Sequence, residues 1–292
     1  MRPALAFALV TSLAAGLWAT AARADELAEK GRAIFKQHQR AVVTVQVVMK
    51  AKMSFGGMGD QGNESKQDLT GTVIDPSGLT VLALSATDPT SVIRSLLGGM
   101  GDEDMKFKFD TELTDVKILL EDGTELPAEV VLRDKDLDLA FIRPKTKPAQ
   151  PMPAVDLANA GQADVLDQVI TLNRLGKAAG RAYAASVERI SAVVQKPRLF
   201  YVPESTVTAT ALGSPAFLPD GKILGICVMR AVSSDGGGMG LFSLQPQGLT
   251  GIILPAADVL KVAKQASEAK GDAAKPAEKK TDSGPEKTSN PQ

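Results

Sequence analysis

The sequence VKILLEDGTELPAEVVLR, residues 116–133, places two apolar runs on either side of the tetrapeptide EDGT. The Asp-Gly pair, Asp122 and Gly123, supplies the positive φ angle that a tight hairpin turn needs. The flanking runs have the branched residues and the length that are typical of strands. The stretch therefore predicts an antiparallel β-hairpin in the first half of the chain.

Strand-like segments recur at short intervals on both sides of this hairpin. In AVVTVQVVMK, residues 41–50, alternate positions are apolar, which predicts a strand with one buried face. The alternating residues are Val43, Val45, Val47 and Met49. The other candidate strands are GTVI, LTVLAL, LDLAFI, DQVITL, YAASVERISAVV, TVTAT and AFLPDGKILGICVM. Many short strands joined by turns are typical of antiparallel β-barrels or sandwiches, so the sequence predicts an all-β protein.

A proline-rich segment divides the strands into two groups of similar size. Proline cannot donate to a β-ladder, so RPKTKPAQPMPAVD indicates a linker. Helical spacing precedes the first strand and follows the last, and residues 265–292 lack Val, Ile, Leu, Met and aromatic side chains. The predicted segments are a signal peptide (1–24), an N-terminal helix (25–40), a first barrel (41–145), a linker (146–156), a second barrel (157–254), a C-terminal helix (255–268) and a disordered tail (269–292).

The N-terminus has the pattern of a secretory signal peptide. Arg2 precedes an apolar stretch over residues 4–18, and Ala22 and Ala24 stand at the −3 and −1 positions of a cleavage point. The alternative is an uncleaved membrane anchor. Cleavage after Ala24 predicts a periplasmic or secreted protein without a membrane span. It leaves 31 basic and 34 acidic residues, a net charge of −3, because two of the 33 basic residues are removed.

Composition narrows the possible ligands. The whole chain carries 33 basic and 34 acidic residues, and aromatic residues make up 4% of it. This balance does not indicate nucleic-acid binding. Cys227 has no second cysteine with which to form an intrachain disulfide, and its strand-like surroundings favour a buried, inert thiol over a reactive one.

Three glycine-methionine motifs raise the possibility of a metal site. They are GGMGD at 56–60, GGMGD at 98–102 and GGGMG at 236–240, with Met53 and Met105 near the first two. Thioether sulfur suits Cu(I), whereas the alternative reading is three flexible surface loops. No His, Cys or fixed spacing accompanies the motifs, so the sequence assigns no metal and no cofactor.

The order of these pieces, over about residues 30 to 265, resembles the trypsin-like (chymotrypsin-fold) serine peptidases, most closely the periplasmic HtrA/Deg type. The resemblance implies two six-stranded antiparallel β-barrels with short N- and C-terminal helices. That family usually adds a peptide-binding PDZ module, whereas only the tail follows here. The blocks that carry the resemblance are GTVIDPSGLTVLALSATD, VKILLEDGTELPAEVVLRDKDLDLAFI, LDQVITLNRLG with ASVERISAVV, STVTATALGSPAFLPDGKILGI and GLTGIILPAADVLKVAKQ.

The resemblance implies a degenerate catalytic triad. The catalytic His of the family falls on Ser85, the Asp on Asp138, and the nucleophilic Ser on Leu212. A serine hydroxyl needs a neighbouring base that titrates near the working pH, and the Asp only orients that base. Losing the nucleophile or the base costs about 10⁶-fold in kcat.

The loop around Leu212 is also altered. The glycine that donates one oxyanion-hole amide falls on Thr210, Gly213 is kept, and Ser214 replaces a second glycine. The one histidine of the chain, His38, lies on the apolar face of the leading helix, which favours a packed or surface side chain. A pairing of Ser214 with a lysine would need no histidine, but no lysine stands out in the sequence.

The sequence therefore predicts an exported pseudoprotease that binds an extracytoplasmic protein or an extended peptide by strand addition. The loops at 52–67 and 88–112 are candidates for further contacts. An active endopeptidase of the HtrA type, with an unrecognised nucleophile and base, is the alternative. A structural envelope protein tethered through its tail is a third hypothesis, and the sequence assigns no oligomeric state.

Overall fold

The computed structural model describes residues 26–55, 58–90, 108–205, 211–231 and 249–269. The predicted signal peptide, nearly all of the predicted tail, Thr210 and the glycine-methionine motifs at 98–102 and 236–240 lie outside these residues. None of the helices in the described ranges combines the length and the apolar character that a membrane crossing requires.

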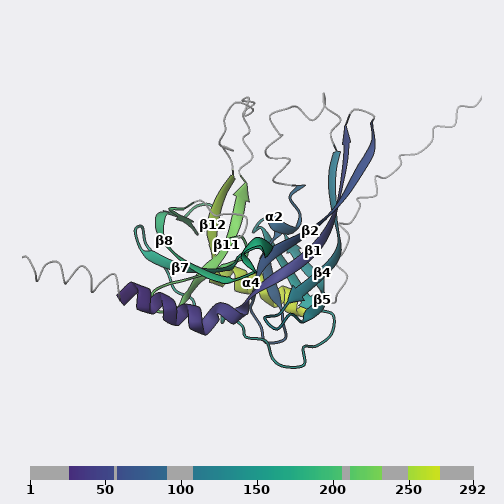
Figure 1. Cartoon of the computed structure of the whole chain (residues 1–292). Coiled ribbons are helices and arrows are strands. Elements are labelled where there is room, and N and C mark those ends of the chain that lie inside the picture. The colour runs from purple at the N-terminus through teal and green to yellow at the C-terminus, as the bar shows by residue number, and fades with distance from the viewer. Residues whose placement is uncertain (1–25, 56–57, 91–107, 206–210, 232–248, 270–292) are drawn as a thin grey trace, which may run out of the picture.

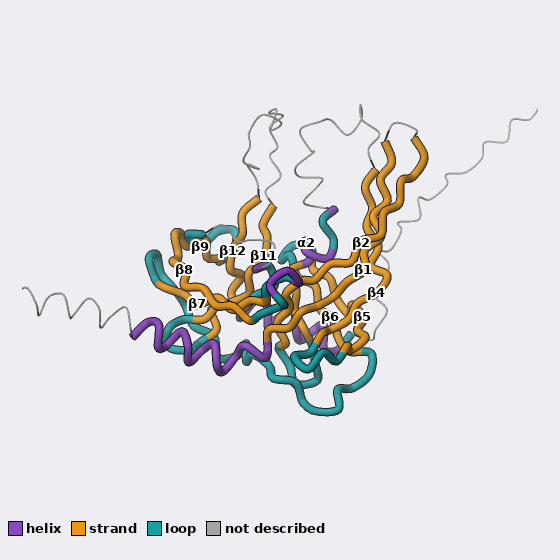
Figure 2. The backbone as a smooth tube through the Cα atoms, in the orientation of Figure 1, coloured by secondary structure: helices purple, strands orange, loops and turns teal. Residues whose placement is uncertain are grey.

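The first half of the chain forms a closed antiparallel barrel with the strand order β1-β2-β3-β6-β5-β4 (Figure 2). Its strands are β1 (Val42–Phe55), β2 (Met58–Val73), β3 (Thr80–Ala83), β4 (Lys108–Leu119), β5 (Glu125–Asp134) and β6 (Leu139–Pro144). The hairpin predicted at residues 116–133 joins β4 and β5, and Gly123 has the positive φ of 84° that its turn requires.

The second half closes a second antiparallel barrel, in the order β10-β11-β12-β9-β8-β7. Its strands are β7 (Gln168–Arg174), β8 (Tyr183–Val194), β9 (Phe200–Pro203), β10 (Pro215–Phe217), β11 (Ile223–Ala231) and β12 (Leu249–Pro255). The prediction of two six-stranded antiparallel barrels is thus confirmed.

Helices are few and short. A helix over residues 26–38 leads into η1 (Gln39–Ala41) and β1. Within the described ranges the other helices with defined bounds are α2 (Leu84–Thr87), η2 (Lys177–Ala179) and α4 (Ala256–Glu268). Helix α4 packs against strands of both barrels (Figure 1). Residues 146–156 run along the first barrel, where the Val155 amide donates to the Val73 carbonyl at 2.9 Å.

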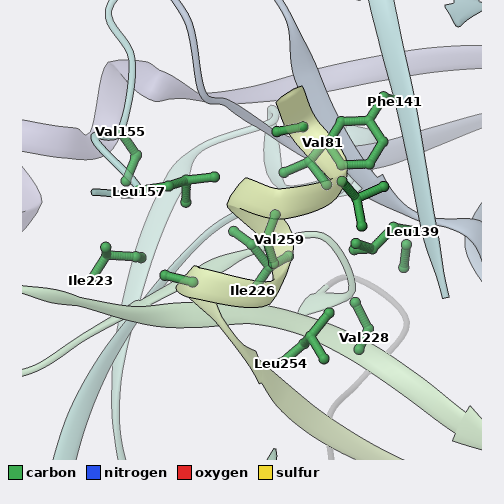
Figure 3. Packing of buried hydrophobic residues seen from close by; sticks show 14 of the residues in the cluster. Val81, Leu139, Phe141, Val155, Leu157, Ile223, Ile226, Val228, Leu254 and Val259 are labelled. Carbon is green, nitrogen blue, oxygen red and sulfur yellow. The ribbon is translucent and has the colours of Figure 1, made fainter. Parts of the chain in front are cut away.

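Three apolar cores follow from the alternation of side chains along the strands. One fills the first barrel, one fills the second, and a third lies between them. In β3 and β6, residues such as Val81 and Phe141 face the core between the barrels, whereas Leu82 and Ile142 point into the first barrel. Figure 3 shows Val81 and Phe141 beside residues of α4 and β11.

The prediction of one buried face for residues 41–50 is wrong. Val45 and Val47 fill the first barrel as expected, but Thr44 and Gln46 on the opposite face are buried as well. The reason is that β1 also lies against β7 of the second barrel. Local alternation predicts a strand, but it cannot show that a second barrel covers the polar side.

Candidate functional site

Ser85 and Asp138, which the resemblance assigns to the family's catalytic base and acid, lie in direct contact. Ser85 is in α2, the single helical turn after β3, and Asp138 immediately precedes β6. The Ser85 hydroxyl donates to Asp138 Oδ2 at 2.8 Å, and the Ser85 amide donates to Oδ1 at 2.6 Å. Asp138 has a left-handed backbone with φ of 57°, which places its carboxylate under α2.

The second barrel supplies a third donor to the same carboxylate. The Met229 amide in β11 donates to Asp138 Oδ2 at 2.7 Å. Three hydrogen bonds from two barrels therefore hold the carboxylate, and none comes from an imidazole. The single histidine, His38, stacks instead on Phe217 of β10 with ring centroids 4.6 Å apart. Burial lowers the pKa of His38.

The electrostatics of Asp138 are dominated by its burial. Desolvation penalises the charged form and outweighs the hydrogen bonds from Met229 and Ser85, which raises the pKa of Asp138 to about 6. In a working triad the Asp stabilises an imidazolium. Among the described residues the carboxylate has only neutral donors, the Ser85 hydroxyl and the Ser85 and Met229 amides, and none of these groups is a base for an attacking hydroxyl.

Leu212, at the nucleophile position, is part of the core between the barrels, and only 5% of its surface is exposed. The next residue, Gly213, has φ of 86°, and a Cβ there would overlap the Thr70 carbonyl oxygen. The Thr72 hydroxyl donates to the Gly213 carbonyl at 2.7 Å. The first barrel thus anchors this loop, and the leucine points into apolar packing.

Ser214 lies two residues further on and is fully buried. Its amide donates to the Ala211 carbonyl at 3.1 Å, and its carbonyl accepts from the Cys227 amide at 2.9 Å. Its hydroxyl has no hydrogen-bond partner among the described residues. No described lysine or histidine contacts it, so the arrangement contains no activated serine at this position.

A pocket of about 260 Å³ opens beside Asp138 and Ser85. Apolar side chains and three cations line it. The lining residues are Ser85, Lys135, Asp136, Leu137, Asp138, Arg198, Phe200, Met229, Arg230, Ile252 and Leu254. The Arg230 guanidinium lies 5.1 Å from the centroid of the Phe200 ring, a cation–π distance. Leu212 is not among the lining residues.

Sequence reasoning missed most of this pocket. Arg198 lies between β8 and β9, Phe200 begins β9, Met229 and Arg230 belong to β11, and Lys135 precedes β6. No spacing in the sequence links these segments, because only the closure of the second barrel against the first brings them together. Ser85 and Asp138 were found because each lies in a block that carries the family resemblance.

Among the described residues, no strand pairs with one edge of β11 beside the pocket. β10 pairs with β11 only over residues 223–226, whereas β12 pairs with residues 225–231. The Cys227 amide and carbonyl bond to Ser214 and Gly213 on the β10 side, and the Met229 amide reaches Asp138. Because backbone groups alternate along a strand, the Met229 carbonyl and the Ala231 amide and carbonyl also face this edge.

A family model of the trypsin-like peptidase domain matches residues 69–226, which is more than half of the chain. The chain belongs to this family. The resemblance to trypsin-like serine peptidases is therefore confirmed. Among solved structures, the apo protease domain of MamO from Magnetospirillum magneticum is similar, with a TM-score of 0.47 and 15% identity over 78% of this chain and 98% of that one. No curated protein matches the sequence.

This trypsin-like domain shows neither a metal cluster nor a reactive thiol within the described ranges. No three His, Cys, Asp or Glu side chains gather there as metal ligands would. Burial raises the pKa of Cys227 to about 12, so its thiol stays protonated and unreactive at neutral pH.

Proposed function

We propose that this trypsin-like domain is a pseudoprotease that binds an extended polypeptide outside the cytoplasm and does not cleave it. The observation that carries the proposal is the Asp138 carboxylate, whose hydrogen bonds go to Ser85 and Met229. A trypsin-like serine peptidase requires an imidazole or another base at that place, and a hydroxyl at the position that the resemblance assigns to Leu212. Both required groups are replaced by side chains that cannot perform their steps.

The unpaired edge that β11 presents among the described residues supports the proposal that the domain binds an extended polypeptide. An added strand gains affinity from backbone hydrogen bonds, and these need no triad. The backbone groups of Met229 and Ala231 on this edge pair with no other strand in the described part of the chain, and Met229 also lines the pocket at Asp138. A polypeptide paired with residues 228–231 would therefore pass over this pocket and place alternate side chains against it.

The extracytoplasmic location rests on the signal-peptide pattern of residues 1–24. Fractionation of cells that express the chain with a C-terminal tag tests this part. A processed protein in the periplasm or medium supports it, and an unprocessed protein in the cytoplasm contradicts it.

Reaction with a fluorophosphonate probe tests the lack of catalysis. The probe labels serines that a neighbouring base activates, so we expect no labelling of the purified protein, with trypsin as the positive control. Casein incubated overnight with the protein should stay intact.

A Ser214→Ala variant tests the alternative, in which the protein is an active serine endopeptidase. Ser214 is the serine of the altered loop that has an unpartnered hydroxyl. Labelling or casein cleavage that disappears in this variant would overturn the pseudoprotease proposal. Equal and negligible labelling of both proteins supports it.

A further inference from the structure

We infer that the polypeptide bound along β11 carries acidic side chains, and that Arg198 and Arg230 recognise them. This inference rests on the proposed function, because it concerns a strand seated on the same edge. Its starting point is the charge around the pocket. Three cations, Lys135, Arg198 and Arg230, line it beside an apolar floor that includes Phe200 and Leu254.

The two arginines are free to bind a ligand. Within the described part of the chain, neither Arg198 nor Arg230 forms an ion pair or a side-chain hydrogen bond, and Arg230 only stacks over Phe200. Stacking on the ring orients the guanidinium while leaving its N–H groups available. The positive charge of Lys135 also attracts the Asp88 carboxylate and helps to lower its pKa. We therefore expect the two arginines, more than Lys135, to select an acidic ligand.

The acids of the pocket do not neutralise these cations. Two carboxylates, Asp136 and Asp138, face three positive charges. The Asp138 carboxylate already accepts three hydrogen bonds and lies buried under α2. A net positive charge is left at the exposed rim, where a negatively charged side chain gains attraction and a lysine is repelled.

The geometry of strand addition gives the acidic groups a definite spacing. Arg230 lies in β11 between Met229 and Ala231, the residues that present the free backbone groups. Side chains two residues apart on an added strand point to the same face. A planar guanidinium suits a carboxylate through two parallel hydrogen bonds. The ligand class is therefore an extended segment with Asp or Glu at alternating positions.

Selection from a phage-displayed pool of random nonapeptides tests the inference. We expect the purified protein to enrich sequences with Asp or Glu two residues apart. A rhodamine-labelled peptide made from one enriched sequence, and its Glu→Gln version, then give affinities by fluorescence anisotropy. The acidic peptide should bind roughly tenfold more tightly, because hydrogen bonds to charged groups are the stronger ones.

Two variants assign the effect to the pocket. In Arg198→Gln/Arg230→Gln, the affinity for the acidic peptide should fall to that of its Gln version. The control variant Arg189→Gln removes an exposed charge in β8, outside the pocket, and should keep the preference.

The outcomes separate the two proposals. Enriched peptides without an acidic preference, or a preference that survives in the double variant, overturn the inference and leave the strand-edge proposal standing. A protein that enriches no peptide overturns both proposals.

Discussion

At the scale of single residues, Leu212 is a buried side chain of the core between the barrels. The resemblance places it where the family has a nucleophile, yet it packs among residues contributed by both barrels. A serine at this position would be a polar group without an evident partner. The local sequence around Gly213 keeps the turn of a nucleophile loop, while the side chain at its tip now stabilises the fold.

We expect Leu212→Ala to lower the free energy of unfolding by about 2–5 kcal/mol, because it removes buried methyl groups and leaves a cavity. Urea denaturation followed by circular dichroism measures this. Leu166→Ala is the matched control, since 66% of Leu166 is exposed, and it should change stability by at most about 0.5 kcal/mol. Equal effects of the two substitutions would contradict the packed position of Leu212.

At the scale of elements, one carboxylate joins three of them. Asp138 before β6 accepts hydrogen bonds from Ser85 in α2 and Met229 in β11, and its own carbonyl accepts from the Leu84 amide at 2.8 Å. The turn of α2 is therefore fixed by the residue that would have oriented a catalytic histidine. The hydrogen bonds that Asp138 accepts from Ser85 and Met229 link the first barrel to the second.

The raised pKa of Asp138 predicts a pH dependence of stability. The folded state binds this proton more tightly than the unfolded chain, whose value is near 3.8, so the contribution of Asp138 is complete below about pH 4. It is lost as the pH rises through about 6. Between pH 4 and 7 the free energy of unfolding of the wild type should fall by roughly 2 kcal/mol relative to that of Asp138→Asn, as measured by urea denaturation.

A second variant checks the origin of this effect. Ser85→Ala removes a hydrogen bond that lowers the pKa of Asp138, so the loss of stability should move to higher pH. A difference between wild type and Asp138→Asn that does not vary with pH would show that Asp138 is not the titrating group.

At the scale of the whole molecule, polar links reinforce the apolar core between the barrels. The Arg181 Nε, after β7, donates to Asp68 Oδ2 in β2 at 2.7 Å, and Gln46 donates to Asp68 Oδ1 at 3.1 Å. Burial alone would raise the pKa of Asp68, but the hydrogen bonds from Arg181 and Gln46 outweigh it and the pKa is lowered. Asp68 is therefore ionised at neutral pH and forms an ion pair with Arg181.

We expect Arg181→Gln to lower the free energy of unfolding at pH 7 by roughly 1–2 kcal/mol, between the values of exposed and buried pairs. The difference should shrink as the pH falls through the lowered pKa of Asp68, because a protonated acid no longer attracts the guanidinium. Lys222→Gln breaks an exposed pair with Asp220 and should have a much smaller effect. Equal losses in the two variants would contradict a link between the barrels.

Much of the fold could be predicted because its signals are local. The Asp-Gly turn at 122–123 and the alternation in β1 are patterns of neighbouring residues. Both patterns predicted the strands correctly. Burial of Thr44 and Gln46 could not be predicted, since their environment comes from the other barrel. For the same reason, no sequence signal pointed to Arg198 or to its proximity to Arg230.

The sequence by itself determined many strands joined by turns and the presence of a single histidine, because hairpin turns, side-chain alternation and residue identity are properties of short segments. That these strands close into two barrels was implied by the family resemblance. Only the tertiary structure decided that the Asp138 carboxylate bonds to Ser85 and Met229, that Leu212 is buried, and that Arg198 and Arg230, which form no ion pair with any described residue, line one pocket with Met229 of β11. These features depend on contacts between residues far apart in the chain, which form when the two barrels pack together.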